Sequence, residues 1–152
     1  MDTSSLTILF ALGSALLGTR AAAWLAGVVA DTFGIATMPP LGIIAVLALF
    51  MIVLHLGFAS ATALASATMP IVIALLIRAQ GHDPSLNVVG MTLIVHFTVC
   101  FGFILPVNAP QNMVAFSTGA FAPREFLRSG LPLALLAYGT VLLLSATYWR
   151  WI

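Results

Sequence analysis

Charged side chains are scarce in this sequence. They make up 6% of its 152 residues, and the five basic residues are all arginine. Soluble domains carry about 25% charged residues. Because 62% of the residues are hydrophobic, so little charge cannot cover a water-facing surface, and the sequence predicts an integral membrane protein built of helices. A formal net charge of +1 without a basic cluster excludes a nucleic-acid partner.

Groups that carry out chemistry are equally sparse. The single cysteine, Cys100, cannot form a disulfide within the chain, and its apolar surroundings predict a small buried side chain. His55 and His96 each stand alone in an apolar segment, so both are interpreted as buried, hydrogen-bonded histidines rather than metal ligands. The sequence has no nucleophile with a base, no metal cluster and no glycine-rich phosphate loop, which argues against an enzyme.

The first predicted unit, residues 1–37, combines a membrane helix with an arm. Residues 5–18 are short for a span, which takes about 20 residues. A signal peptide is the alternative, but the segment before this helix carries an acid and no base. Residues 21–35 follow Arg20 and include Trp24, a pattern typical of an amphipathic arm at the membrane interface.

The second unit, residues 38–80, begins with two prolines and is apolar over residues 41–77. Its middle carries two copies of Ser-Ala-Thr, which start at Ser60 and Ser66. Two interpretations compete: two full spans joined by a short loop, or a re-entrant hairpin whose polar tip stays inside the membrane. Each arm is near or below the spanning length, and a small uncharged tip makes a poor aqueous loop. These features favour the re-entrant hairpin.

Residues 78–85 form a predicted aqueous loop, and residues 85–152 form a broken membrane helix followed by a last one. The helix over 86–105 is interrupted at 106–112, where two prolines and two asparagines fall within seven residues. The remaining predicted elements are a turn over residues 120–128 and a final span over residues 131–149.

Both interruptions place free backbone groups and neutral polar side chains inside the membrane. The N-terminal ends of half-helices suit anions, and their carbonyl ends suit sodium. Ser60 and Thr62 add hydroxyls at the first interruption, and Asn108 and Asn112 add amides at the second. In the structural alternative, hydroxyls bond back to their own helix and prolines only kink it. The pair of breaks, without a nearby acid, favours an anion site over a proton relay.

Two segments resemble signatures of the divalent-anion:sodium symporter family. Residues 58–63, Phe-Ala-Ser-Ala-Thr-Ala, with the later Met69-Pro70, resemble the family's second Ser-Asn-Thr signature. Residues 105–112, Leu-Pro-Val-Asn-Ala-Pro-Gln-Asn, resemble its Leu-Pro-Val-Ala-Thr-Pro-Pro-Asn signature. Residues 116–119 and 124–133 are similar to the family's C-terminus. The resemblance implies a homodimeric, sodium-coupled transporter of dicarboxylates, citrate or sulfate that works by an elevator-like motion.

The resemblance further implies that the chain is the second of two inverted repeats. Such a repeat is an all-α polytopic unit with a spanning helix, an interfacial arm, a re-entrant hairpin, a broken helix and a final spanning helix. The missing first repeat would come from the same polypeptide or from a partner chain. The implied substrate-binding residues are Ser60, Ala61, Thr62, Asn108, Ala109 and Pro110. The implied sodium-binding residues are Ser60, Thr62, Val107, Asn108 and Asn112.

Two positions depart from the family signatures. Ala61 replaces the signature asparagine, and Ala109 replaces the signature threonine, so the identity of the anion stays open. The rival interpretation is a membrane protein that assembles with others without transporting anything, or a degenerate fragment of a transporter. We expect no cofactor besides the coupling sodium ion, a location in a bacterial inner membrane, and lipid around the helices.

Overall fold

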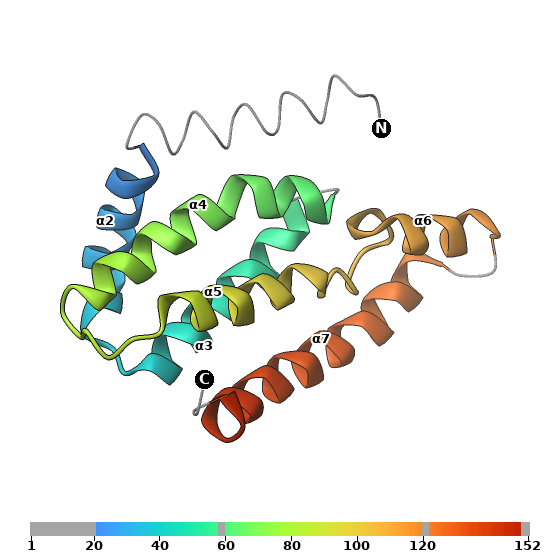
Figure 1. Ribbon diagram of the computed structural model, residues 1–152. Helices are drawn as coiled ribbons and strands as arrows, with labels where there is room; N and C mark the ends of the chain where they lie inside the picture. The colour runs from blue at the N-terminus through green and yellow to red at the C-terminus, as the bar shows by residue number, and fades with distance from the viewer. Residues whose placement is uncertain (1–20, 58–59, 120–121, 150–152) are drawn as a thin grey trace.

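A computed structural model describes residues 21–57, 60–119 and 122–149 (Figure 1). The predicted first membrane helix, residues 5–18, lies outside the described residues. Within them every regular element is a helix, which confirms the all-α prediction. In chain order the elements are α2 (Ala21–Phe33), η1 (Ile35–Thr37), α3 (Pro40–Leu54), η2 (His55–Gly57), α4 (Ala61–Gln80), α5 (Val88–Phe97), η3 (Thr98–Cys100), η4 (Pro106–Asn108), α6 (Pro110–Ser117) and α7 (Pro123–Ala146).

Helices α3 and α4 form an antiparallel hairpin (Figure 1). Helix α3 starts at Pro40, in the first turn, where a missing N–H costs nothing. Helix α4 starts after Ser60, whose hydroxyl caps it by accepting the N–H of Ala63 at 3.4 Å. The second Ser-Ala-Thr copy lies inside α4, as the predicted second arm over residues 63–77 has it, and its alanine favours helix. Thr68 of that copy donates to the Leu64 carbonyl at 2.7 Å.

Helix α4 is 20 residues long, longer than the second arm predicted over residues 63–77. Among the described residues, α4 and residues 124–146 of α7 are long and apolar enough to cross a membrane. Helix α3 and residues 88–100 are shorter apolar helices. Arm length alone no longer separates a re-entrant hairpin from two spans, and re-entrance stays a prediction.

The predicted arm is a helix, α2, that packs against α4 (Figure 1). Ala30 is buried in the core, whereas Trp24 is exposed. Arg78 of α4 reaches Asp31 of α2 with a 2.7 Å ion pair between two exposed side chains. An exposed pair of this kind contributes at most about 1 kcal/mol. Apolar packing therefore holds α2 in place, and its interfacial position stays a prediction.

The broken helix is interrupted earlier than the sequence suggested. Helical structure stops after η3, and residues 101–105 are not helical before η4 begins at Pro106. Proline disfavours helical geometry at the preceding residue, and its ring clashes with the carbonyl four residues back. For Pro106 these positions are Leu105 and Gly102. Leu105 is accordingly extended, with φ −122° and ψ 148°.

Helix α7 begins at Pro123, so the predicted turn over residues 120–128 is largely wrong: Arg124, Glu125 and Arg128 are helical. The Glu125 carboxylate accepts the N–H of Ala122 at 2.7 Å. A carboxylate in the first turn also stabilises the positive end of the helix dipole. These short-range contacts let the helix start well before its apolar stretch.

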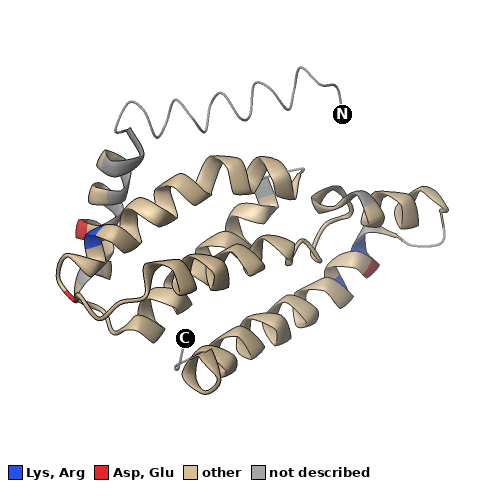
Figure 2. Ribbon diagram, in the orientation of Figure 1, with Lys and Arg blue, Asp and Glu red and all other residues tan. Residues whose placement is uncertain are grey.

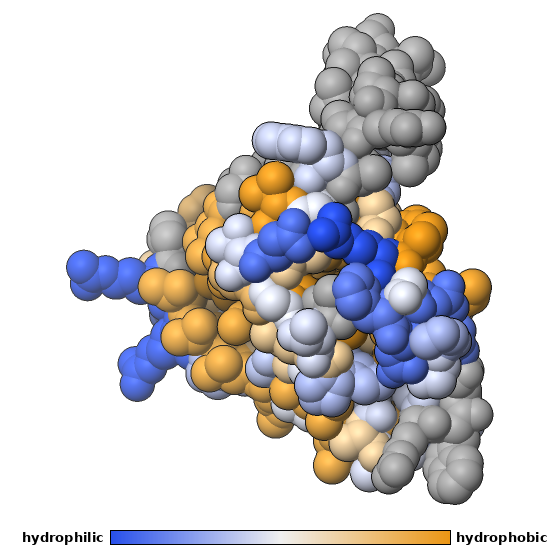
Figure 3. Space-filling model, turned by 90° about the vertical axis from the view of Figure 1, so that its left-hand side faces the viewer, coloured by the Kyte–Doolittle hydropathy of each residue, from blue (hydrophilic) through white to orange (hydrophobic). Residues whose placement is uncertain are grey.

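The buried core lies between α3, α4 and α5, around Leu47, Met51, Leu64, Leu76 and Val95. Helix α7 packs against α3 and is otherwise widely exposed. Charged side chains gather at the two ends of the molecule (Figure 2). Figure 3 looks onto the end formed by residues 81–87 and shows hydrophilic residues collected there beside hydrophobic surface. An apolar belt between two polar ends suits a bilayer.

Candidate binding site at the two helix breaks

The two breaks lie at the same end of the bundle, away from the loop over residues 81–87 (Figure 1). The Asn108 side-chain amide donates a hydrogen bond to the backbone carbonyl of His55, across 53 residues of sequence. Both residues are 1% exposed. Because η2 ends the first arm of the hairpin and η4 sits in the break, this bond ties the hairpin to the broken helix.

Gly102 lies between these two residues. A Cβ at this position would lie 3.0 Å from Cβ of Asn108 and 3.3 Å from Cδ2 of His55. The junction has no room for a larger side chain. The Gly102 backbone comes this close to Asn108 and His55, which explains why residue 102, four residues before Pro106, is a glycine.

Asn112 closes the break from the other side. Its side-chain amide donates to the carbonyl of Gly102 at 2.8 Å and to that of Leu105 at 3.2 Å. In a continuous helix the Gly102 carbonyl would accept the N–H of residue 106, which proline lacks. The Asn112 side chain replaces that missing donor. Its nitrogen therefore faces carbonyls, and only its oxygen is suited to a cation.

The remaining predicted residues sit at two helix starts. Ser60, Ala61 and Thr62 open α4, and Thr62 is exposed. Ala109 is the extended residue before α6, and Pro110 is that helix's first residue. The backbone of Val107 lies within η4. The structure thus places the two predicted groups at neighbouring interruptions, which Asn108 and His55 connect.

Two residues predicted to be buried are exposed. His96 and Cys100 both face outward. The core face of this segment carries Ile94, Val95, Thr98 and Val99, and a helix turns by about 100° per residue. Positions 96 and 100 therefore point away from the core. His55 is buried as predicted, and its Nδ1 lies 3.3 Å from the Met51 carbonyl.

Among the described residues there is no group of three or more histidine, cysteine or acidic side chains suited to a metal ion. Sequence reasoning missed the His55 carbonyl and Gly102 as parts of the site. A backbone carbonyl carries no sequence signal. The spacing from Gly102 to Pro106 is a signal that points to the start of the break.

Replacing Asn112 with alanine is expected to loosen the break. The change leaves the Gly102 and Leu105 carbonyls without the amide donor, and each partly buried carbonyl then loses about 1 kcal/mol of net hydrogen-bond free energy. Thermal unfolding in detergent should show a lower midpoint. Gln111→Ala removes a neighbouring exposed amide and should leave the midpoint nearly unchanged. Equal midpoints for the two variants would contradict this role of Asn112.

The described residues form apolar helices with a helical hairpin and a broken helix, which the Asn108–His55 hydrogen bond connects. This is an arrangement of a helical membrane protein. The chain belongs to the family described as the sodium:sulfate symporter transmembrane region, whose model matches residues 4–152. This match confirms the resemblance drawn from the two signature segments.

Individual relatives agree with this family. A protein named "Membrane protein" from Cupriavidus necator is 50% identical over 141 residues, which cover 93% of this chain and 27% of that protein. The Na(+)/dicarboxylate cotransporter 3 of Rattus norvegicus is 31% identical over 143 residues, covering 93% of this chain and 22% of the cotransporter. The mouse cotransporter of the same name is also 31% identical over 143 residues. The chain therefore spans about a quarter of the length of these relatives.

Proposed function

We propose that this chain supplies one half of the translocation site of a sodium-coupled transporter for a small divalent anion. The hydrogen bond from Asn108 to the His55 carbonyl carries this proposal, because it joins the two interruptions into one buried unit. Family membership and the cotransporter names of relatives support the transport class. A purely assembling protein has no need of two joined breaks.

The anion is proposed to bind where α4 and α6 begin. The first-turn N–H groups of a helix carry partial positive charge and attract anions. Ser60 and Thr62 add hydroxyl donors at the start of α4, and Ala61 and Ala109 add none. At the second break, Asn108 and Pro110 flank Ala109 and set the course of the backbone into α6. A site with few amide donors favours a compact anion such as sulfate over a long dicarboxylate.

Sodium is proposed as the co-transported cation. The donors around the breaks are neutral oxygens, which suit a monovalent hard cation. Hydroxyls of Ser60 and Thr62 and backbone carbonyls near Val107 are the proposed ligands. Asn108 and Asn112 direct amide nitrogens to carbonyls, so these residues hold the break in shape and offer a cation their oxygens only.

The remaining parts of the transporter are proposed from what the family resemblance implies. A first inverted repeat, in the same polypeptide or in a partner chain, supplies the opposite hairpin and break. The whole works as a homodimer by an elevator-like motion in a bacterial inner membrane. The bacterial origin of the Cupriavidus relative supports that location.

Uptake of radiolabelled sulfate and succinate tests this function. The polypeptide that carries this sequence is produced in cells that lack their own uptake, and initial rates are measured with sodium or with choline as the cation. We expect saturable, sodium-dependent uptake. Ser60→Ala should raise the KM for the anion about tenfold, because it removes both a hydroxyl donor and the α4 cap, worth about 1 kcal/mol.

Ser66→Ala is the matched control, because Ser66 begins the second Ser-Ala-Thr copy inside α4. Its KM should stay near that of the unchanged protein. Uptake that is absent for both anions, or that does not depend on sodium, would overturn the proposal. An equal effect of the two serine changes would overturn the assigned site.

A further inference from the structure

Two arginines lie near the helix breaks, at the start of α7 (Figure 2). Arg124 and Arg128 are about one helical turn apart and exposed, and neither has an ion-pair partner within the described part of the chain. Glu125, the acid between them, is also exposed and accepts the N–H of Ala122 at 2.7 Å. Two positive charges and one negative charge leave the start of α7 electropositive.

Two contacts of α7 bring these charges close to the breaks. The backbone of Gly130 lies so near the non-helical segment that a Cβ there would overlap the carbonyl oxygen of Phe103. The ring of Phe126 meets that of Phe116, near the end of α6, edge to face with centroids 6.1 Å apart. Because a helix rises 1.5 Å per residue, the two arginines lie about 3 and 9 Å along the axis from Gly130. Both charges thus lie within about one Debye length of the break at physiological salt.

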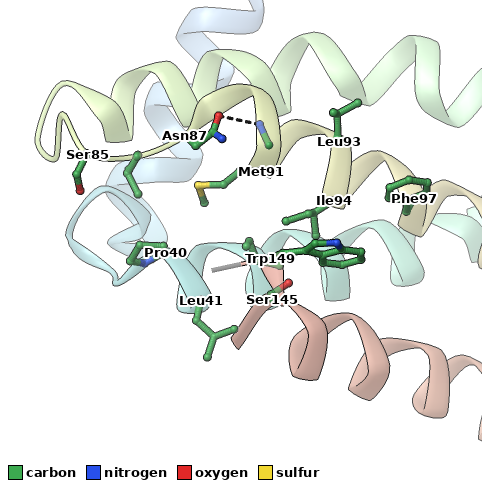
Figure 4. Close-up of a pocket in the computed structure, with 13 residues that line it drawn as sticks. Pro40, Leu41, Ser85, Asn87, Met91, Leu93, Ile94, Phe97, Ser145 and Trp149 are labelled. Atoms are coloured by element: carbon green, nitrogen blue, oxygen red, sulfur yellow. Dashed lines mark hydrogen bonds between the residues drawn. The ribbon is translucent and has the colours of Figure 1, made fainter. Parts of the chain in front are cut away.

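The opposite end of the molecule offers an anion no such attraction. Arg78 is paired there with Asp31 at 2.7 Å. Asp83 accepts the hydroxyl of Ser85 at 2.6 Å and its N–H at 3.0 Å, and these bonds lower the pKa of the Asp83 carboxyl, which stays negative. The cavity of about 570 Å³ at this end is lined by no charged side chain among the described residues (Figure 4). Within the described ranges, the excess of positive charge therefore lies beside the breaks.

A positive charge strengthens anion binding without touching the anion. In water, one unit charge about 10 Å from a divalent anion raises its affinity about fourfold, and that of a monovalent anion about twofold. Salt screens this attraction: the fourfold gain falls to roughly threefold at about 0.01 M ionic strength and disappears near 1 M. Charges at this distance therefore select an anion by its valence, and the selection fades as salt is added.

We propose that Arg124 and Arg128 select divalent anions for the site at the breaks by long-range attraction, without contacting the bound anion. This inference rests on the proposed function, because it concerns the same site. The hydroxyls and helix starts at that site carry no formal charge, so they discriminate weakly between anions of different valence. The two arginines supply the preference, and Glu125 opposes them.

Equilibrium dialysis of radiolabelled sulfate against the purified polypeptide that carries this sequence tests the role of the arginines. The sodium concentration is held constant, and choline gluconate sets the ionic strength. Changing both arginines to glutamine should raise the Kd for sulfate about sevenfold at about 0.01 M ionic strength. The same change should leave the Kd nearly unaltered at about 1 M, because salt then screens the charges.

Three further variants separate charge from structure. Arg124→Lys combined with Arg128→Lys keeps both charges and should bind sulfate as the unchanged protein does. Glu125→Gln keeps an oxygen that can accept the N–H of Ala122 and removes the negative charge, so it should lower the Kd about threefold at low ionic strength. Arg78→Gln removes a positive charge at the opposite end and should leave the Kd unchanged.

A glutamine double variant that binds sulfate at low ionic strength as tightly as the unchanged protein would contradict the long-range role. A Kd raised equally at low and high ionic strength, or raised by the lysine changes as well, would instead assign the arginines to direct contact or to local folding. Either result leaves the proposed function intact, since the unchanged protein still binds the anion. Absence of sulfate binding by the unchanged protein would contradict the proposed function and this inference together.

Discussion

Asn108→Ala is expected to reduce anion uptake at least about tenfold and to lower the free energy of unfolding by about 1–3 kcal/mol. The change removes the donor to the His55 carbonyl and leaves that buried acceptor unsatisfied. It also empties space beside Gly102 at a junction with almost no solvent access. The hairpin and the broken helix would then lose their direct bond, so the proposed site would lose its geometry. Uptake rates and thermal unfolding of the purified protein measure the two effects.

Gln111→Ala provides the control, because this amide is exposed on α6 only three residues away. It should change neither uptake nor unfolding. Asn108→Asp separates size from hydrogen bonding, since the carboxylate keeps the shape and has no N–H donor. We expect it to be at least as damaging as alanine. Full uptake by Asn108→Asp would show that the bond to His55 does not hold the site together.

The breaks were predictable from the sequence because proline and glycine act locally. Pro106 and Pro110 each lack an N–H donor and crowd the carbonyl four residues back, so two prolines this close together strongly disfavour a continuous helix. The exact start of the break was not predictable, because residues 101–105 are apolar and resemble helix. They leave the helix since Pro106 constrains Leu105 and since Asn112, several residues later, satisfies the freed carbonyls. That compensation depends on the fold and not on neighbouring sequence.

Burial was harder to infer than helical structure. In an apolar membrane segment, periodicity is weak, because residues facing lipid and residues facing the core are both hydrophobic. His96 and Cys100 were placed inside for this reason, although both face outward. His55 was placed correctly, but its contribution to the site is its backbone carbonyl. A main-chain acceptor cannot be read from residue identity.

The start of α7 was placed wrongly although local sequence signals mark it. Hydropathy placed the last helix at residue 131, yet the helix begins at Pro123. Proline in the first turn and Glu125 bonded to the Ala122 N–H are local signals that hydropathy ignores. The earlier start matters for the site, because it brings residue 130 of α7 against the break.

Gly130→Ala is the second change with a large expected effect. A Cβ at Gly130 would overlap the Phe103 carbonyl oxygen and would lie 2.8 Å from its carbonyl carbon and 2.9 Å from Cα of Ile104. Backbone atoms cannot rotate away as a flexible side chain does, so α7 or residues 101–105 must move. Overpacking of this kind costs about 1–3 kcal/mol. We expect a lower unfolding midpoint in detergent and, because the shifted segment carries the break, slower uptake.

Gly139→Ala gives a control of opposite sign in the same helix. No atom lies within 4 Å of a Cβ at Gly139, so the added methyl group meets open space. Alanine in a helix interior is more favourable than glycine by roughly 0.5–1 kcal/mol. The two single-methyl changes should therefore move the unfolding midpoint in opposite directions. If Gly130→Ala stabilised the protein as Gly139→Ala does, α7 would not pack against residues 101–105, and the last helix would have no part in holding the break.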